Sequence, residues 1–121
     1  MDRMKQLRIE ENPIVNKAFK FALEIIQYTD ALEADKKYVI ANQLLKSGTS
    51  IGANIWESQH AESKADFIHK LKIAAKEAKE TEYWLLLCSY SKAFPAVTDK
   101  LERLLEIQKL LSKIISTSKK T

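Results

Sequence analysis

The stretch Ser47–Glu57, SGTSIGANIWE, contains both glycines of the 121-residue chain and decides how the chain is interpreted. A phosphate-binding loop needs glycines clustered directly before a helix, often with a following lysine. Here the glycines stand four residues apart, and the next lysine is Lys64. In a helix, by contrast, Gly48 and Gly52 lie one turn apart on the same face. The stretch therefore favours a helix over a ligand-binding loop.

Each glycine lowers helix stability by about 1 kcal/mol relative to alanine, which suggests a compensating close approach of two backbones. The stretch also carries a polar stripe on a neighbouring face, and if this stripe is buried its groups need partners inside the protein or across a subunit interface. We predict a hydrogen-bonded helix crossing in preference to a ligand site. The predicted packing motif consists of Ser47, Gly48, Ser50, Ile51, Gly52, Asn54, Ile55 and Glu57.

Apolar residues at steps of three and four predict further helices on both sides of this stretch. The first helix is expected to begin at Pro13, with Asn12 as its N-cap. Its predicted core seam is Val15, Phe19, Ala22, Ile26 and Thr29. The helix that contains the two glycines has Ile40, Leu44, Ile51 and Ile55 on one side.

The second half of the chain has two heptad seams, the repeat typical of left-handed helix packing. The first seam is Phe67, Leu71, Ala74, Ala78, Thr81, Leu85 and Cys88, and the second is Val97, Leu101, Leu104, Gln108, Leu111 and Ile115. The predicted helices span about 13–33, 36–58, 63–93 and 96–117, with 1–11 and 118–121 flexible. The predicted fold is all-α: one domain, an antiparallel up-and-down four-helix bundle with left-handed packing.

Two stretches are too apolar for a single seam: Tyr83–Tyr90, and a second stripe on the last helix. A helix that is apolar on more than one face must bury more than one face. Another subunit is the simplest cover, and a central helix inside a monomer is the alternative. The candidate interface residues are Trp84, Leu86, Leu87, Tyr90, Ile107, Leu110 and Ile114.

The composition favours a cytoplasmic protein. No apolar run approaches the ~20 residues that cross a bilayer, and the charged start resembles no secretory signal. The single cysteine, Cys88, cannot form an internal disulfide and is interpreted as a small core residue.

The formal charge of +4 is compatible with an anionic partner. Lys72, Lys76 and Lys79 form a basic strip, and like charges at this spacing repel one another by a few tenths of a kcal/mol. The alternative is a solvated face beside Glu77 and Glu80. If nucleic acid binds, contacts to phosphate are expected, and binding would depend steeply on salt. The candidate residues are Lys72, Lys76, Lys79, Lys109, Lys113, Lys119 and Lys120.

A metal-dependent enzyme is the alternative that the histidines raise. Glu57-x-x-His60 has the spacing of carboxylate-bridged di-iron bundles, and Asp66-x-x-His69 imitates it, with Glu24 or Glu106 as further ligands. Both motifs lie beside one short turn, however, so solvated histidines are the simpler interpretation. We expect no cofactor, no metal and no catalytic residues.

The central sequence also resembles a known family. A run of small-Ser50-Ile51-x-x-Asn54-Ile55-x-Glu57 is followed by Ser63-x-x-Asp66-Phe67 and Glu80-x-x-Tyr83-Trp84-Leu85. This pattern is similar to the bacterial four helix bundle protein family, also called the 23S ribosomal RNA intervening-sequence protein family. Trp56 departs from it, because many members have a small or acidic residue there.

The resemblance implies an antiparallel bundle that assembles into a ring-like homopentamer, with no catalytic residue. Some relatives are encoded within ribosomal RNA genes. Another is the accessory variability determinant protein of diversity-generating retroelements, which binds a reverse transcriptase and nucleic acid through basic surface. We therefore expect a non-enzymatic scaffold or adaptor for RNA, DNA or a nucleic-acid-processing protein. A module for protein–protein contacts alone remains the main alternative.

Overall fold

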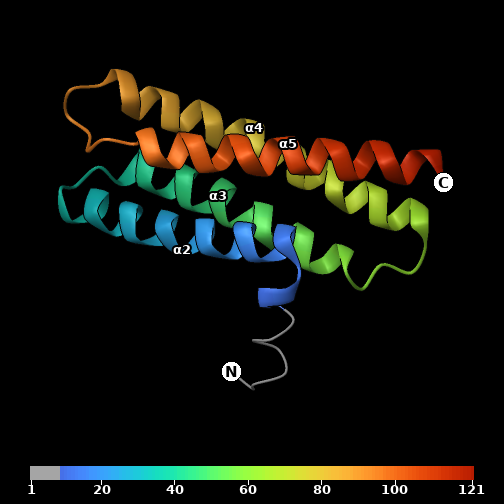
Figure 1. Ribbon diagram of the computed structural model, residues 1–121. Helices are drawn as coiled ribbons and strands as arrows, with labels where there is room; N and C mark the ends of the chain where they lie inside the picture. The colour runs from blue at the N-terminus through green and yellow to red at the C-terminus, as the bar shows by residue number, and fades with distance from the viewer. Residues whose placement is uncertain (1–8) are drawn as a thin grey trace.

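The computed structural model describes residues 9–121, which are helical apart from short connections. Four long helices follow one another: α2 (Pro13–Ala34), α3 (Tyr38–Ser58), α4 (Lys64–Tyr90) and α5 (Thr98–Lys120) (Figure 1). Residues 9–11 are also helical, and residues 9–121 contain no β-strand. The predicted all-α class is thereby confirmed. No helix in this range is long and apolar enough to cross a membrane.

The helix ends follow local capping chemistry. The side chain of Asn12 accepts a hydrogen bond from the backbone N–H of Val15 at 3.4 Å, and Pro13 opens α2 as predicted. Ser63 caps α4 in the same way through the N–H of Asp66, at 3.1 Å. Between α2 and α3, Lys36 adopts a left-handed backbone conformation with φ of 63°.

Two predicted boundaries are wrong at the C-terminal side. Helix α4 ends at Tyr90 instead of 93, because Ser91 is already extended. Helix α5 continues to Lys120, beyond the expected end at 117. Its last turn carries Lys119 and Lys120, and cations there interact favourably with the helix dipole. Within the segment 1–11 that was expected to be flexible, residues 9–11 are helical, and residues 1–8 lie outside the described part of the chain.

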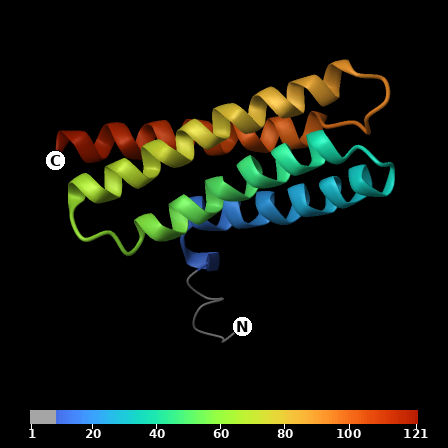
Figure 2. The ribbon, with the colours of Figure 1, turned by 180° about the vertical axis from the view of Figure 1, so that it is seen from behind.

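Consecutive long helices run in opposite directions and lie side by side (Figures 1 and 2). Helix α2 lies next to α3 and α5, and α4 lies next to α3 and α5, whereas the backbones of α2 and α4, and those of α3 and α5, do not approach each other closely. The four helices therefore form a closed circuit with two diagonal pairs. As a consequence, the outer face formed by α2 and α3 lies opposite the outer face formed by α4 and α5.

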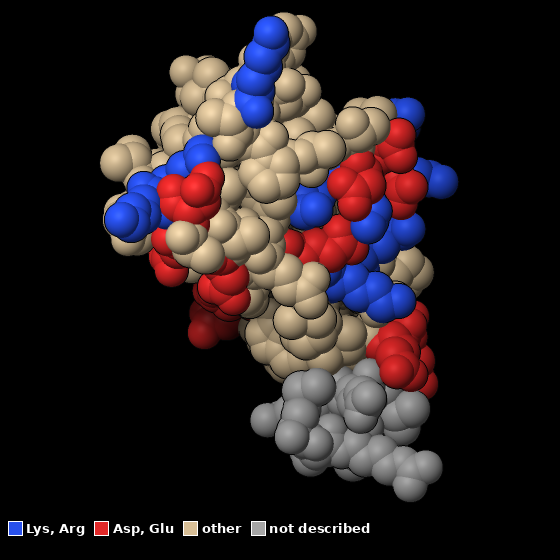
Figure 3. Space-filling view, turned by 90° about the vertical axis from the view of Figure 1, so that its left-hand side faces the viewer, with Lys and Arg blue, Asp and Glu red and all other residues tan. Residues whose placement is uncertain are grey.

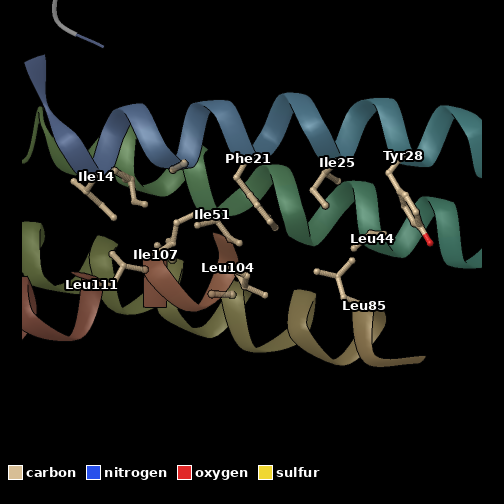
Figure 4. Close-up of a cluster of buried hydrophobic side chains, with 14 of the residues drawn as sticks. Ile14, Phe21, Ile25, Tyr28, Leu44, Ile51, Leu85, Leu104, Ile107 and Leu111 are labelled. Carbon is tan, nitrogen blue, oxygen red and sulfur yellow. The ribbon is translucent and has the colours of Figure 1, made fainter. Parts of the chain in front are cut away.

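The core fills the space between all four helices. Figure 4 shows Phe21 and Ile25 of α2 pointing toward Leu44 of α3, Leu85 of α4 and Leu104 of α5. These five side chains are at most 1% exposed. The predicted α4 seam is buried from Leu71 to Cys88, and Phe67 packs against the core from its edge.

The predicted core seam of α2 is confirmed at Val15 and Thr29, which are buried, and is wrong at Phe19 and Ile26. The residues that the structure buries along the centre of the helix are Ile14, Ala18, Phe21, Ile25, Tyr28 and Leu32. Phe19 is 39% exposed and Ile26 is 40% exposed. The helix carries two adjacent apolar stripes, and only the stripe that begins at Ile14 faces the centre. The other stripe, which includes Phe19 and Ile26, lies at the outer edge toward α3.

Candidate functional site

The glycines of α3 lie where α3 crosses α2. A Cβ atom added to Gly48 would stand 2.9 Å from Cγ2 of Ile25, a buried α2 side chain. A Cβ atom added to Gly52 would stand 3.4 Å from the backbone oxygen of Ala18, an ordinary contact distance. Neither glycine has a positive φ. The absence of a side chain therefore permits a close helix approach, most strictly at Gly48.

The polar stripe of the same motif is satisfied within the protein. The hydroxyls of Ser47 and Thr81 share a buried hydrogen bond of 3.0 Å between α3 and α4. Ser50 donates to the carbonyl of Lys46 in its own helix. Asn54 likewise donates to the carbonyl of Ser50 at 2.9 Å. Only the Ser47 contact thus joins two helices through buried polar groups.

The last residue of the motif is exposed. The carboxylate of Glu57 accepts a hydrogen bond from the ammonium of Lys70 at 3.0 Å, which ties the end of α3 to the start of α4. Ile51 and Ile55 are fully buried on the adjacent core face. The motif is therefore a helix-packing element whose groups need no ligand.

The predicted basic residues converge at one pair. Lys72 of α4 and Lys119 of α5 lie against each other, and the side-chain contact together with charge repulsion lowers the pKa of Lys72. Neither lysine forms an ion pair with any residue in 9–121. Two exposed lysines from two helices therefore lie near each other without a protein counterion, and their positive charge attracts anions.

The other predicted nucleic-acid-binding lysines differ in how many acidic residues lie near them. Lys79 is tied to Glu82 at 3.3 Å, and Glu82 also accepts a hydrogen bond from Gln108 of α5 at 2.9 Å. The segment 107–121 contains four lysines and no acidic residue. These lysines are the predicted Lys109, Lys113, Lys119 and Lys120, and all four are exposed. Positive charge therefore dominates the C-terminal half of α5.

The predicted subunit-interface residues divide into buried and exposed groups. Ile107 is 1% exposed and belongs to the core, so it is not available to a second subunit. Trp84, Leu110 and Ile114 are partly buried against the core. The second apolar stripe of α5 is covered mostly within the protomer because α5 packs on both α2 and α4.

The predicted subunit-interface residues that are exposed lie near the C-terminal end of α4. Leu86 and Leu87 are 39% and 40% exposed, and Tyr90 is 86% exposed. Tyr83 and Leu105 are also exposed, and Leu105 lies one turn from Gln108, the α5 residue that contacts Glu82 of α4. We call Tyr83, Leu86, Leu87, Tyr90 and Leu105 the α4–α5 apolar patch.

A second exposed apolar surface covers the α2–α3 face, and the sequence reasoning missed it. Phe19, Leu23 and Ile26 of α2 are between 39% and 48% exposed. Beside them lies a cavity of about 320 Å³. Its lining residues are Ile9, Val15, Phe19, Ala22, Thr49, Gly52, Ala53 and Trp56. The apolar residues of α2 fill two stripes, and that pattern was the signal for an uncovered face.

Trp56, the residue that departs from the family pattern, lies at the end of this groove. It is 38% exposed, and its ring centroid lies 6.4 Å from that of His60. Trp56 also lines a neighbouring cavity of about 500 Å³ with Asn12, Gln59 and His60. The side-chain amide of Asn12 donates to Gln59 at 3.0 Å there.

The structure does not bring the metal-motif carboxylates together. Glu57 binds Lys70, while His60 and His69 are exposed. Glu24 pairs with Arg103 at 2.7 Å, and Glu106 pairs with Lys17 at 3.2 Å. Among residues 9–121, no three His, Cys, Asp or Glu side chains lie close enough to share a metal ion.

Those two ion pairs lie on the flank formed by α2 and α5. Basic and acidic side chains alternate along this flank, on the right of Figure 3. Opposite charges in adjacent positions neutralise one another, so this flank attracts anions less than the Lys72–Lys119 pair does.

Cys88 lies in the core as expected, close to Tyr28. Burial raises the pKa of the Cys88 thiol, and burial together with Cys88 raises the pKa of the Tyr28 hydroxyl. That hydroxyl donates to the carbonyl of Pro95 at 2.7 Å. Both groups are therefore held neutral, which suits a structural role and not a nucleophilic one.

Comparison with known proteins identifies relatives of this fold. The crystal structure of a protein of unknown function from the S23 ribosomal protein family of Bacteroides thetaiotaomicron is 44% identical in sequence. The match covers 84% of this chain and 97% of that chain, with a TM-score of 0.81. No curated protein matches the sequence. The family model described as 23S rRNA-intervening sequence protein matches residues 10–116. This chain therefore belongs to the 23S rRNA-intervening sequence protein family.

Proposed function

We propose that this protein is a non-enzymatic, cytoplasmic scaffold or adaptor that self-assembles and binds the phosphate backbone of RNA or DNA. The observation that carries the proposal is the run of four exposed lysines on the acid-free segment 107–121 of α5, with Lys72 of α4 beside it. Like charges gathered on one surface repel one another, and a bound phosphate relieves that repulsion. No metal, cofactor or catalytic group takes part.

The remaining lysines of α5 support an extended contact. Lys109, Lys113 and Lys120 lie on the same acid-free segment as Lys119. Lysine acts on phosphate as a point charge and does not read base edges, so binding is independent of sequence. Neutralising several phosphates releases counterions, which makes affinity fall steeply as salt rises.

The test is a titration of labelled RNA and DNA across a salt series. Lys72→Gln/Lys119→Gln should weaken binding and reduce the log–log salt slope by about 0.9 for each lost duplex phosphate contact. The control Lys46→Gln/Lys92→Gln removes the same charge from exposed positions on α3 and on the α4–α5 connection. No binding at low salt contradicts the proposal, and so does an equal loss in both variants.

We further propose that the four helices form an up-and-down bundle with left-handed packing, supported by the heptad seams of α4 and α5. The family resemblance suggests a ring-like homopentamer. A ring repeats the modest basic surface of each subunit and raises avidity for a long polyanion. Sedimentation analysis measures the subunit number, and a monomer at working concentration contradicts the assembly.

A second candidate function is a module for protein–protein contacts alone, with a nucleic-acid-processing protein among its partners. The exposed apolar α2–α3 face favours it, because surfaces of this kind mark protein interaction sites. Stable assembly combined with an absence of nucleic-acid binding would select this candidate over the first.

A further inference from the structure

Trp56 lies between two cavities and is half-buried. It lines the groove of about 320 Å³ on the α2–α3 face and also the cavity of about 500 Å³ at the start of α2. The volume of the larger cavity falls within the range of about 300–1,000 Å³ that is typical of ligand pockets. An indole ring beside an open space of this size offers a flat, apolar surface to a planar ligand.

The residues around the larger cavity define which ligand it suits. Pro13 and Val15 line it with apolar atoms, and His60 adds a second aromatic ring beside that of Trp56. Glu11 also lines the cavity, and its side chain is exposed. The cavity therefore combines aromatic and apolar walls with one carboxylate.

The carboxylate of Glu11 is open to a ligand. It forms no ion pair with any residue in 9–121. The amide side chains of Asn12 and Gln59, which also line the cavity, are by contrast hydrogen-bonded to each other at 3.0 Å. Glu11 thus presents two acceptor oxygens, and a ligand that matches them must carry two adjacent donors.

Guanine has both properties, a planar ring and two adjacent donors. Its N1–H and its N2 amino group stand side by side on the Watson–Crick edge, whereas adenine, cytosine and uracil each alternate donors with acceptors there. A base whose Watson–Crick edge is bound by a protein must be unpaired, which is the usual form in which proteins read single strands.

We propose that an unpaired guanine of single-stranded RNA or DNA enters this cavity, stacks on Trp56 and donates two hydrogen bonds to Glu11. This inference rests on the proposed nucleic-acid binding and specifies which form of nucleic acid is bound. A carboxylate repels phosphate, so Glu11 favours entry of the base edge and leaves the backbone on the side of the lysines.

The cavity lies at the same end of the bundle as the basic surface. The end of α3, the start of α4 and the end of α5 gather there (Figure 1). Glu57 of α3 pairs with Lys70 of α4 at 3.0 Å, so these two residues are about level along the bundle. Because α3 and α4 are antiparallel, Lys72 is then about level with Trp56, and Lys119 lies near Lys72.

This arrangement lets one strand reach both features. Axes of packed helices lie about 8–10 Å apart, so a few nucleotides span the distance from Trp56 on α3 to Lys72 on α4. An arginine of a protein partner would also match an indole and a carboxylate. The nearby lysines repel a basic protein and attract a polyanion, which favours the nucleic acid.

The first test is fluorescence of Trp56. The chain has two tryptophans, so Trp84→Phe leaves Trp56 as the single emitter. A thymidine octamer with one central guanine should quench its emission, because the base stacks on the indole. The same octamer in duplex form should bind without quenching, because its guanine edge is paired. The reciprocal variant Trp56→Phe keeps only Trp84 and should show no quenching.

The second test separates stacking from charge. Trp56→Ala should weaken binding of the guanine-containing octamer by about 5- to 150-fold, and Trp56→Phe should weaken it less. Neither variant should change the log–log salt slope, because stacking releases no counterion, whereas Lys72→Gln/Lys119→Gln should lower that slope. Trp56 is 38% exposed, so the helicity measured by circular dichroism should be kept.

The third test concerns the choice of base. Octamers with guanine or adenine at the central position measure the preference. Glu11→Gln replaces one acceptor oxygen with a donor and removes the charge, so it should reduce the preference for guanine about tenfold. The matched control Glu10→Gln removes the same charge from the adjacent residue, which is exposed and does not line the cavity, and should keep the preference.

The outcomes distinguish this inference from the proposed function. If no nucleic acid binds at low salt, the proposed function is refuted. If nucleic acid binds but Trp56 is not quenched and Trp56→Ala binds normally, only the base site is refuted. If the all-thymidine octamer quenches as strongly as the guanine octamer, the role of Glu11 is wrong. Saturation by free 5′-GMP at the same concentration as the octamer would assign the cavity to a nucleotide instead of a strand. Quenching by an octaarginine peptide alone would assign it to a protein partner and overturn the inference.

Discussion

Replacing Gly48 with alanine should destabilise the protein, although alanine is the better helix former. The substitution gains about 1 kcal/mol of helix propensity. Against this gain, the new Cβ atom would lie 2.9 Å from Cγ2 of Ile25 and 3.1 Å from its Cγ1. Ile25 is fully buried and branched at Cβ, so it cannot rotate away cheaply. Overpacking of this kind costs about 1–3 kcal/mol, which leaves a net loss of about 1 kcal/mol.

Gly52→Ala is the matched comparison in the same helix. Its Cβ atom would lie 3.4 Å from the oxygen of Ala18, which is an ordinary contact, so the propensity gain should dominate. We expect a stabilisation of up to about 1 kcal/mol. The two variants should therefore differ by about 2 kcal/mol in the free energy of unfolding, or about 8 °C in Tm for a chain of this size.

The assay is urea unfolding followed by circular dichroism at fixed protein concentration, because assembly also contributes to stability. A double-mutant cycle with Ile25→Ala isolates the contact. Gly48→Ala should become stabilising once Ile25 is truncated, because the methyl group then fills part of the cavity. If Gly48→Ala is as stable as Gly52→Ala in the wild-type background, close approach to Ile25 does not explain the glycine.

Four further predictions follow from local geometry. Ser47→Ala should lower the free energy of unfolding by about 1 kcal/mol, because the buried hydrogen bond to Thr81 is lost. Thr81→Val should destabilise the Ser47→Ala variant less than it destabilises the wild type, and chemical unfolding measures both effects. Lys36→Gly should stabilise the protein by about 1 kcal/mol in thermal unfolding, because glycine adopts the positive φ without strain, and an unchanged Tm contradicts this account. Cys88 should resist a thiol reagent at pH 8 until the protein unfolds, and rapid labelling of the native state would show that it is accessible. Folding raises the pKa values of Cys88 and Tyr28, so the folded state favours their neutral forms. The free energy of unfolding should therefore be constant below the unfolded-state pKa values of about 8.5 and 10 and should fall as the pH rises above them. Tyr28→Phe should reduce this loss of stability at alkaline pH.

The sequence predicted α4 well because one unambiguous stripe runs along it from Phe67 to Cys88. On α2 it was right for Val15 and Thr29 but wrong for Phe19 and Ile26, because two apolar stripes stand side by side and periodicity does not tell which one faces inward. The inward stripe is selected by Gly48, whose missing side chain seats Ile25 of the first stripe. That choice depends on contacts between distant residues, which local patterns do not encode.

The candidate surfaces were predictable to different degrees. The lysines were identified from spacing and charge, but the contact between Lys72 and Lys119 depends on the register of α4 against α5. Ile107 was misassigned because the apolar arc of α5 is wide enough to face two helices at once. The exposed side of α2 was missed because Phe19 and Ile26 had already been assigned to the core.

The contact between α2 and α5 constrains the order in which the molecule can mature during synthesis. A ribosome makes α2 first among the long helices, yet one of its two neighbours, α5, spans Thr98–Lys120. Until translation has passed that segment, the nascent α2–α3 hairpin exposes the inward stripe as well as the outer one. An incomplete chain that exposes both apolar stripes of α2 is prone to aggregate. The inward stripe of α2 is therefore covered completely only after the lysine-bearing helix has emerged, so that the basic surface and the finished core become available together.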